Sequence, residues 1–286
     1  MSCGQWRADI ASEIGGSILS LMHAGRAVLR PTPAEAVEAR AVRRTACFPL
    51  IPYANRIADG RFAWDGQSHR LAENFPASPH PLHGIGWRRV WRVISADTGD
   101  CTLRLEHRPN SDEQDWPFAF DAEQRISVSA EGLQVELSVS NAHPRPAPLG
   151  LGLHPLFPRR GGERLTFDAG GAWRNGADML PAARVTGDLW DHAAGQAIGA
   201  QDLDNDFFAW QGSARIESQH LPAIRISASP VFSCLRVFTP PDKDFFAVEP
   251  VSHSTDAINR ERGAELLRVQ PGERLCGTMT INLGAQ

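Results

Sequence analysis

The clearest pattern along the chain is a strict alternation of hydrophobic and polar residues. Between residues 126 and 140 the hydrophobic positions share one face of an extended chain, and they are Ile126, Val128, Leu133, Val135, Leu137 and Val139. Because successive side chains of a strand point to opposite faces, this pattern predicts two half-buried β-strands. Glu131 and Gly132 stand between them and predict the turn of a hairpin.

The same alternation recurs in shorter stretches, at residues 103–105, 224–226 and 275–283, each bounded by Gly, Pro, Asp or Asn. Helical spacing of hydrophobic residues is rare. Residues 34–44 have a helix-forming composition, but they follow two prolines and lack a continuous apolar face. We therefore expect a loop or a short turn of helix there.

The turn residues favour an all-β fold. The 286 residues include 25 glycines and 21 prolines, spread along the chain without a long linker, an internal repeat or a low-complexity tract. Many short strands separated by such turns are typical of an antiparallel sandwich and not of alternating strands and helices. We expect residues 1–286 to form a single all-β domain, a large antiparallel β-sandwich.

Composition restricts the classes of partner and the compartment. A net charge of −4 without a long block of like charge gives no footprint for nucleic acid. The five cysteines are scattered and contain no C-x-x-C pair, which predicts reduced thiols. No stretch approaches the roughly 18 apolar residues of a spanning helix, and residues 1–10 do not resemble a secretory signal. We expect a cytoplasmic protein with neither a nucleic-acid nor a membrane partner.

Several common motifs of catalysis and cofactor binding are absent from the sequence. Gly84-Ile85-Gly86 lacks the third glycine of a dinucleotide-binding turn and runs into Trp87 and two arginines. There is no G-x-S-x-G, no H-E-x-x-H and no cluster of His or carboxylates with metal-ligand spacing. We therefore expect no metal and no organic cofactor.

Polar segments rich in aromatic residues and histidine lie between the predicted strands, where loops on a rigid scaffold commonly carry binding chemistry. They are residues 49–59, 79–91, 150–158 and 238–259. The motifs 52–62 (PYANRIADGRF), 82–87 (LHGIGW), 152–157 (GLHPLF) and 248–257 (VEPVSHSTDA) resemble the aldose 1-epimerase (galactose mutarotase) family in order, spacing and wording. A fifth motif, 203–207 (LDNDF), falls where the family carries its sugar-binding aspartate, and the resemblance extends from about residue 14 to residue 283. The resemblance implies the family's fold, a large antiparallel β-sandwich known as the galactose mutarotase-like supersandwich.

The resemblance also implies an activity. It is the interconversion of the α and β anomers of a free aldohexose such as galactose or glucose, by a monomer or homodimer without a cofactor. This reaction removes the proton of the C1 hydroxyl and donates a proton to the ring oxygen, so that the ring opens. A carboxylate base and an imidazolium acid on opposite sides of the C1–O5 unit suffice.

By resemblance, Glu249 is the general base and His154 the general acid. Glu249 is expected at the end of an apolar strand, before Pro250, where desolvation raises the pKa of a carboxyl group. On residue type alone, Glu249 also fits a surface carboxylate, and His154 also fits a core histidine on an apolar strand.

The resemblance assigns sugar-binding roles to further residues. His83 matches a histidine that hydrogen-bonds the sugar near the ring oxygen, and Arg56 matches an arginine whose planar fork grips two hydroxyls. Asn55 either orients Arg56 or caps a turn. On residue type alone, His83 also fits a turn position and Arg56 a surface ion pair.

Asp204 is the preferred sugar-binding carboxylate because it stands three residues before Phe207, although Asp202 and Asp206 remain open alternatives. At most two of the large aromatic residues are expected to offer a flat face to the sugar, out of Trp87, Trp91, Trp116, Phe157 and Trp210.

Three other functions remain open. A hexose 6-phosphate 1-epimerase of the same fold would need a basic cluster at the pocket, formed by Arg88, Arg89, Arg159 and Arg160. A non-catalytic sugar-binding module would share the fold without the chemistry. A retaining glycosidase would need two carboxyl groups about 5–5.5 Å apart, whereas here the base is paired with a histidine.

Overall fold

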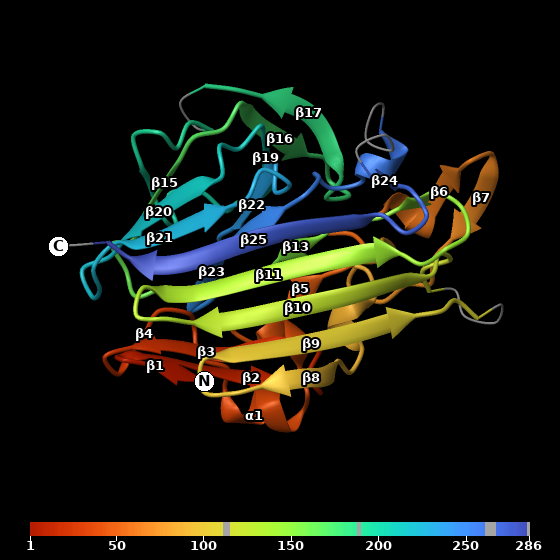
Figure 1. Cartoon of the computed structure of the whole chain (residues 1–286). Coiled ribbons are helices and arrows are strands. Elements are labelled where there is room, and N and C mark those ends of the chain that lie inside the picture. The colour runs from red at the N-terminus through yellow and green to blue at the C-terminus, as the bar shows by residue number, and fades with distance from the viewer. Residues whose placement is uncertain (111–114, 188–189, 261–266, 285–286) are drawn as a thin grey trace.

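The computed structural model describes residues 1–110, 115–187, 190–260 and 267–284. Strands dominate these residues, and their sheets form two main layers (Figure 1). All pairs between named strands in the described ranges are antiparallel, which confirms the expected all-β class.

The front layer in Figure 1 is a nine-stranded sheet with the long strands of the predicted hairpin near its middle. In spatial order it contains β18 (Gln196–Ala197), β15 (Arg164–Phe167), β20 (Ser213–Glu217), β21 (Ile224–Ala228), β25 (Arg274–Leu283), β11 (Gly132–Asn141), β10 (Phe120–Val128), β9 (Asp100–His107) and β8 (Arg92–Ala96).

Behind it lies an eight-stranded sheet, whose central strands carry the candidate site. In spatial order it contains β17 (Pro181–Val185), β16 (Gly171–Asn175), β19 (Asp204–Phe208), β22 (Cys234–Phe238), β23 (Phe245–Val251), β13 (Gly152–Leu153) and β5 (Pro49–Leu50), and β14 (Leu156–Pro158) also pairs with β23.

Smaller elements complete the described chain. The N-terminal residues form a four-stranded sheet of β1 (Ser2–Cys3), β2 (Trp6–Ala11), β3 (Ser17–His23) and β4 (Arg26–Ala27). Two-stranded sheets join β6 (Arg61–Trp64) to β7 (Gln67–Arg70) and β12 (Ala147–Pro148) to β24 (Arg268–Val269). The helix α1 (Ala34–Glu38) and 3₁₀ turns at Val42–Arg44, Ala58–Gly60, Gly86–Arg88 and Ala257–Asn259 lie in loops.

The alternation of side chains joins the two layers into one core. Val135 and Leu137 of the nine-stranded sheet belong to the same buried cluster as Leu235, Val237 and Val248 of the eight-stranded sheet. One face of β22 and β23 is therefore committed to the core. The opposite face of these two strands is left for other contacts, and the site is built there.

Most local predictions are confirmed. The predicted hairpin is present, because β10 and β11 pair from Val128 opposite Leu133 to Phe120 opposite Asn141. Residues 34–44 contain only a short helix and a 3₁₀ turn. The predicted position of Glu249 at a strand end is wrong, because β23 continues to Val251. Pro250 has no N–H to donate to a neighbouring strand. The strand still continues past it, because Glu249 and Val251 pair with β22 and Val251 also pairs with β13.

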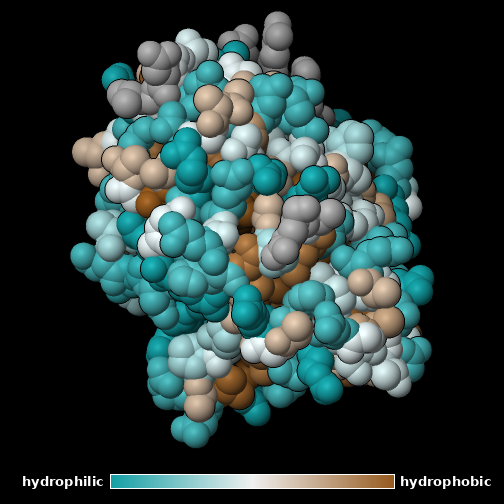
Figure 2. Space-filling model, turned by 90° about the vertical axis from the view of Figure 1, so that its left-hand side faces the viewer, coloured by the Kyte–Doolittle hydropathy of each residue, from teal (hydrophilic) through white to brown (hydrophobic). Residues whose placement is uncertain are grey.

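The surface differs in character from the core. Figure 2 shows a mainly hydrophilic face, in which hydrophobic residues gather in a central hollow and in a smaller patch below it. Within the described ranges, no helix has the length and apolar character needed to cross a membrane.

Candidate active site

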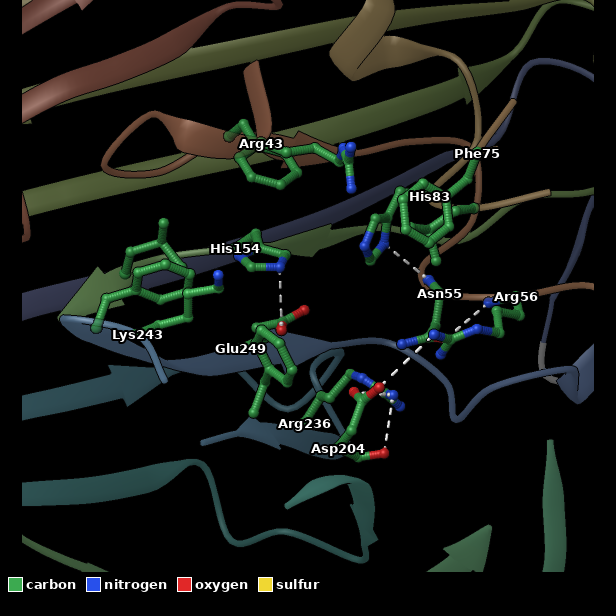
Figure 3. A pocket seen from close by; sticks show the side chains of 15 residues that line it. Arg43, Asn55, Arg56, Phe75, His83, His154, Asp204, Arg236, Lys243 and Glu249 are labelled. Carbon is green, nitrogen blue, oxygen red and sulfur yellow. Dashed lines mark hydrogen bonds and ion pairs between the residues drawn. The ribbon is translucent and has the colours of Figure 1, made fainter. Parts of the chain in front are cut away.

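A cavity of about 270 Å³ lies over the face of β22 and β23 that points away from the core. It contains all six residues that the sequence analysis selected, together with residues that it missed. The lining consists of Arg43, Phe48, Asn55, Arg56, Phe75, Leu82, His83, His154, Leu156, Asp204, Arg236, Phe238, Lys243, Phe245 and Glu249. Figure 3 shows how these side chains converge from separate parts of the chain.

Strand register explains why three charged groups meet in the cavity. Arg236 of β22 lies opposite Glu249 of β23, and Asp204 of β19 lies opposite Phe238 of β22. Directly opposed residues of antiparallel strands point to the same face. The alternate residues of these strands, such as Phe207 and Val248, point into the core.

His154 and Glu249 are in direct contact. Nε2 of His154 lies 3.2 Å from Oε1 of Glu249, and both side chains are almost fully buried. The imidazole ring stacks on the ring of Phe48 with 4.4 Å between ring centroids, and the backbone N–H of His154 donates to the carbonyl oxygen of Phe48. These contacts fix the orientation of the ring. Oε2 of Glu249 has no hydrogen-bond partner in the part of the chain that the structure describes.

Burial opposes the charged form of each member of this pair. Desolvation raises the pKa of Glu249 well above its ordinary value. Desolvation also lowers the pKa of His154 to about 3. Burial therefore favours the form of the pair that holds a single proton and carries no net charge.

His83 is held by Asn55 in a defined tautomer. The backbone N–H of Asn55 donates to the ring atom Nδ1 of His83 at 3.0 Å. In return, the backbone N–H of His83 donates to the carbonyl oxygen of Asn55 at 2.8 Å. Burial lowers the pKa of His83 well below its usual range, so the ring is neutral. Because Nδ1 accepts a hydrogen bond, the ring proton is assigned to Nε2, which becomes a donor for a ligand.

Asn55 also orients Arg56, which decides between the two roles left open for it. Oδ1 of Asn55 accepts hydrogen bonds from the backbone N–H and from Nη1 of Arg56, at 2.9 and 3.0 Å. Nη2 of Arg56 lies 3.6 Å from Oδ2 of Asp204. Nε of Arg56 is buried and has no hydrogen-bond partner within the described ranges, so the guanidinium retains a donor.

The three aspartates of the segment 202–206 have different surroundings. Asp204 lines the cavity, whereas Asp202 is exposed. Asp206 is buried and does not line the cavity. Its Oδ1 accepts a hydrogen bond of 2.7 Å from Arg236, and its Oδ2 accepts one of 2.6 Å from the backbone N–H of Thr255. Although burial alone would raise the pKa of Asp206, the Arg236 charge and the Thr255 hydrogen bonds lower it.

The sequence analysis missed Arg236, a fully buried cation at the centre of the site. Its guanidinium donates to the side chains of Asp204, Asp206 and Thr255. Burial by itself would lower its pKa, but the carboxylates of Asp204, Asp206 and Glu249 raise it. One signal was present in the sequence: Arg236 interrupts the apolar run Cys-Leu-Arg-Val-Phe, and a charged residue inside a buried strand needs a partner.

At most two of five large aromatic residues were expected to face the sugar, and none of the five lines the cavity. All of them are buried in hydrophobic clusters. The aromatic lining comes from other residues, Phe48, Phe75, Phe238 and Phe245.

The four arginines that a hexose 6-phosphate 1-epimerase would need at the pocket do not line the cavity. Arg89 pairs with Asp115, Arg159 donates to the carbonyl oxygen of Pro240, and Arg88 lines a neighbouring hollow. Arg160 lies beside a third hollow.

The fold and this site together define a galactose mutarotase-like protein. The family profile for aldose 1-epimerases matches residues 6–282, and the chain belongs to this family. The uncharacterized protein YphB of Escherichia coli K12 is 31% identical over 294 residues, which cover 99% of this chain and 97% of YphB.

Solved structures agree with this assignment. The structure of a candidate aldose 1-epimerase from Escherichia coli K12 has a TM-score of 0.90 and 30% identity, and the match covers 100% of this chain and 98% of that one. A galactose mutarotase-like protein from Clostridium acetobutylicum has the same fold, with a TM-score of 0.84, 18% identity and coverage of 100% and 94%.

Proposed function

We propose that this protein is a mutarotase, which interconverts the α and β anomers of a free aldohexose such as galactose or glucose. The observation that carries the proposal is the contact between His154 and Glu249, because it places an acid and a base side by side in a cavity. The cavity volume of about 270 Å³ is near the small end of ligand pockets, about 300–1,000 Å³, and suits a single sugar ring.

The reaction needs the single proton that the pair holds. The step starts from the charge-separated form of the pair, in which the shared proton has moved from Glu249 to His154. Glu249 then accepts the proton of the C1 hydroxyl while His154 donates its proton to the ring oxygen, and the C1–O5 bond breaks to give the open aldehyde. Rotation about C1–C2 and the reverse transfers close the ring as the other anomer. The pair ends with the same number of protons, and each positioned group contributes on the order of 10²–10⁴-fold.

The direct contact changes one detail of the expected mechanism. The sequence analysis placed the acid and the base on opposite sides of the C1–O5 unit, but in the free protein they touch each other. Because the C1 hydroxyl and the ring oxygen are bonded to the same carbon, neighbouring groups reach both oxygens. The sugar exchanges the His154–Glu249 contact for one contact with each group.

The other selected residues hold the sugar in this pose. The imidazole ring of His83 lies 5.5 Å from that of His154, between ring centroids. Its Nε2–H therefore donates to a sugar oxygen near the ring oxygen of the substrate. The carboxylate of Asp204 and the guanidinium of Arg56, held by Asn55, bind hydroxyls at the opposite end of the cavity (Figure 3).

Polarimetry on freshly dissolved α-D-galactose and α-D-glucose tests the proposal. We expect the protein to accelerate mutarotation, and Glu249→Gln and His154→Asn each to lower kcat by at least about 10²-fold. Glutamine is isosteric with the protonated Glu249 that burial favours, so this variant should stay folded. His220→Asn, at an exposed position, is the control and should keep the full rate.

Two results would contradict the proposed mutarotase activity or its mechanism. Wild-type kcat in either catalytic variant would exclude the proposed acid–base pair. Sugar binding without any acceleration would favour a non-catalytic sugar-binding module instead.

A further inference from the structure

The cavity carries more positive than negative charge. Its lining includes the cations Arg43, Arg56, Arg236 and Lys243, but only the carboxylates of Asp204 and Glu249. Desolvation raises the pKa of Glu249 and so disfavours its negative charge, which increases the excess. A neutral sugar does not need this excess of positive charge. The excess therefore requires an explanation.

Two of the four cations are already neutralised. Arg236 binds Asp204 and Asp206, and Arg56 faces Asp204. Arg43 and Lys243 differ, because neither has a carboxylate partner in residues 1–110, 115–187, 190–260 or 267–284. The uncompensated charge of the cavity thus belongs to these two side chains.

Arg43 is held in place at the rim without being neutralised. It lies in the 3₁₀ turn Val42–Arg44, and its guanidinium stacks over the ring of Phe75, 4.4 Å from the ring centroid. A cation–π contact orients a guanidinium but leaves its N–H donors available in the plane of the group. Its neighbour Arg44 instead pairs with Glu35, away from the cavity.

Lys243 reaches the cavity from the turn between β22 and β23. It is the single lysine among the 29 basic residues, since all the others are arginines. Its neighbour Asp244 pairs with Arg30 at 3.2 Å, so this carboxylate is engaged elsewhere. Figure 3 shows Lys243 beside His154 and Arg43 above it, whereas Arg56 lies at the right and Asp204 at the bottom.

The chemistry of an aldose converts this arrangement into a position on the substrate. His154 donates to the ring oxygen, which is bonded to C1 and C5, and C6 is attached to C5. A substituent on C6 therefore lies on the His154 side of the ring. The hydroxyls of C2 to C4 lie toward the other end, where Asp204 and Arg56 are available.

We propose that Arg43 and Lys243 form an anion subsite, and that the preferred substrate is an aldohexose with an anionic group on C6, a phosphate or a carboxylate. The proposal rests on the mutarotase function proposed above and narrows its substrate. Arginine and lysine both bind such oxyanions through charge-assisted hydrogen bonds.

Mutarotation rates of the α anomers of glucose, glucose 6-phosphate and glucuronate test the subsite and distinguish the two anions. We expect kcat/KM for at least one anionic sugar to exceed that for glucose by about tenfold or more, and the advantage to shrink as salt is raised. Equal or higher kcat/KM for glucose would overturn the subsite and leave the mutarotase standing.

Variants locate the effect. Arg43→Gln and Lys243→Gln should each reduce the ratio of anionic to neutral kcat/KM by about tenfold. Lys243→Arg, which retains the charge, should preserve most of the ratio. Arg44→Gln is the matched control, because Arg44 is a neighbour of Arg43 that pairs with Glu35 and does not line the cavity. An unchanged ratio in both Gln variants would overturn the subsite.

Acylation of the single lysine gives a readout that does not depend on catalysis. An amine-selective reagent modifies Lys243, and the extent is measured by peptide mass spectrometry on the wild type and on Glu249→Gln. We expect protection by glucose 6-phosphate or glucuronate but not by glucose or inorganic sulfate at equal ionic strength. Protection without turnover in the wild type would support the subsite and contradict the mutarotase, whereas turnover without protection would do the reverse.

Discussion

Arg236 and Glu249 face each other across the antiparallel strands β22 and β23, and their side chains are only 2% and 1% exposed. The guanidinium makes its hydrogen bonds to Asp204 and Asp206 and not to Glu249. Its charge still favours the ionised form of Glu249, against the stronger effect of desolvation. The proposed base is therefore buried beside a cation whose hydrogen bonds are made to other carboxylates.

The first prediction concerns the dependence of activity on pH. Because the pKa of His154 is lowered to about 3, the doubly protonated pair forms only near that pH and below. Because the pKa of Glu249 is raised above 4.5, the last proton leaves only at higher pH. We expect kcat/KM to stay level as the pH falls through 4.5 and to decrease as the pH rises through the raised pKa of Glu249.

Polarimetry between about pH 4 and pH 9, corrected for the spontaneous rate, checks this profile. A loss of half the activity near pH 4.5, the ordinary pKa of a glutamate, would show that burial does not shift the pair. The alkaline decrease should disappear from the residual activity of Glu249→Gln, because glutamine does not titrate.

The second prediction concerns substrate binding. Arg56→Ala should raise KM by about tenfold with a smaller effect on kcat, because Arg56 grips hydroxyls away from the reacting carbon. Arg61→Ala is the control, since Arg61 is an exposed arginine of the same segment. Initial rates over a range of sugar concentrations separate the two constants. A decrease in kcat at unchanged KM would assign Arg56 to the chemical step instead.

The third prediction concerns stability. Asp206→Ala leaves the buried guanidinium of Arg236 without one of its two carboxylate partners, and we expect the free energy of unfolding to fall by about 3–5 kcal/mol. Asp202→Ala, at an exposed carboxylate four residues earlier, should change it by less than about 0.5 kcal/mol. Urea denaturation measures both, and similar values for the two variants would refute the structural role of Asp206.

The fourth prediction concerns the loop that presents His83. Gly84 has φ +66°, and a Cβ there would lie 2.2 Å from the carbonyl oxygen of Ile51. Gly66 has φ +78°, with nothing within 4 Å of its Cβ position. Both Ala variants carry the backbone strain, about 1–2 kcal/mol, but only Gly84→Ala also displaces backbone.

Thermal unfolding and sugar binding compare the two glycine variants. Gly84→Ala should be the less stable and should lose affinity for sugar, because the displacement moves His83 away from Asn55. Equal behaviour of the two variants would show that the approach of Gly84 to Ile51 is not needed.

The sequence by itself determined the local structure and most of the candidate residues. The alternation at Leu133–Val139 required a half-buried strand, since exposing that face to water would cost free energy at every second residue. The segments around Asn55, His83, His154 and Glu249 were distinctive enough to be selected without a structure, and all of them line one cavity.

The tertiary structure decided what depends on pairing between distant segments. The register of β19 on β22 places Asp206 directly opposite Arg236, whereas Asp204 lies opposite Phe238 and lines the cavity. The aromatic lining and the position of Lys243 beside His154 likewise depend on which distant segments pack together. Local sequence fixes which residues share a face of a strand, but which other segments meet that face is set by long-range packing.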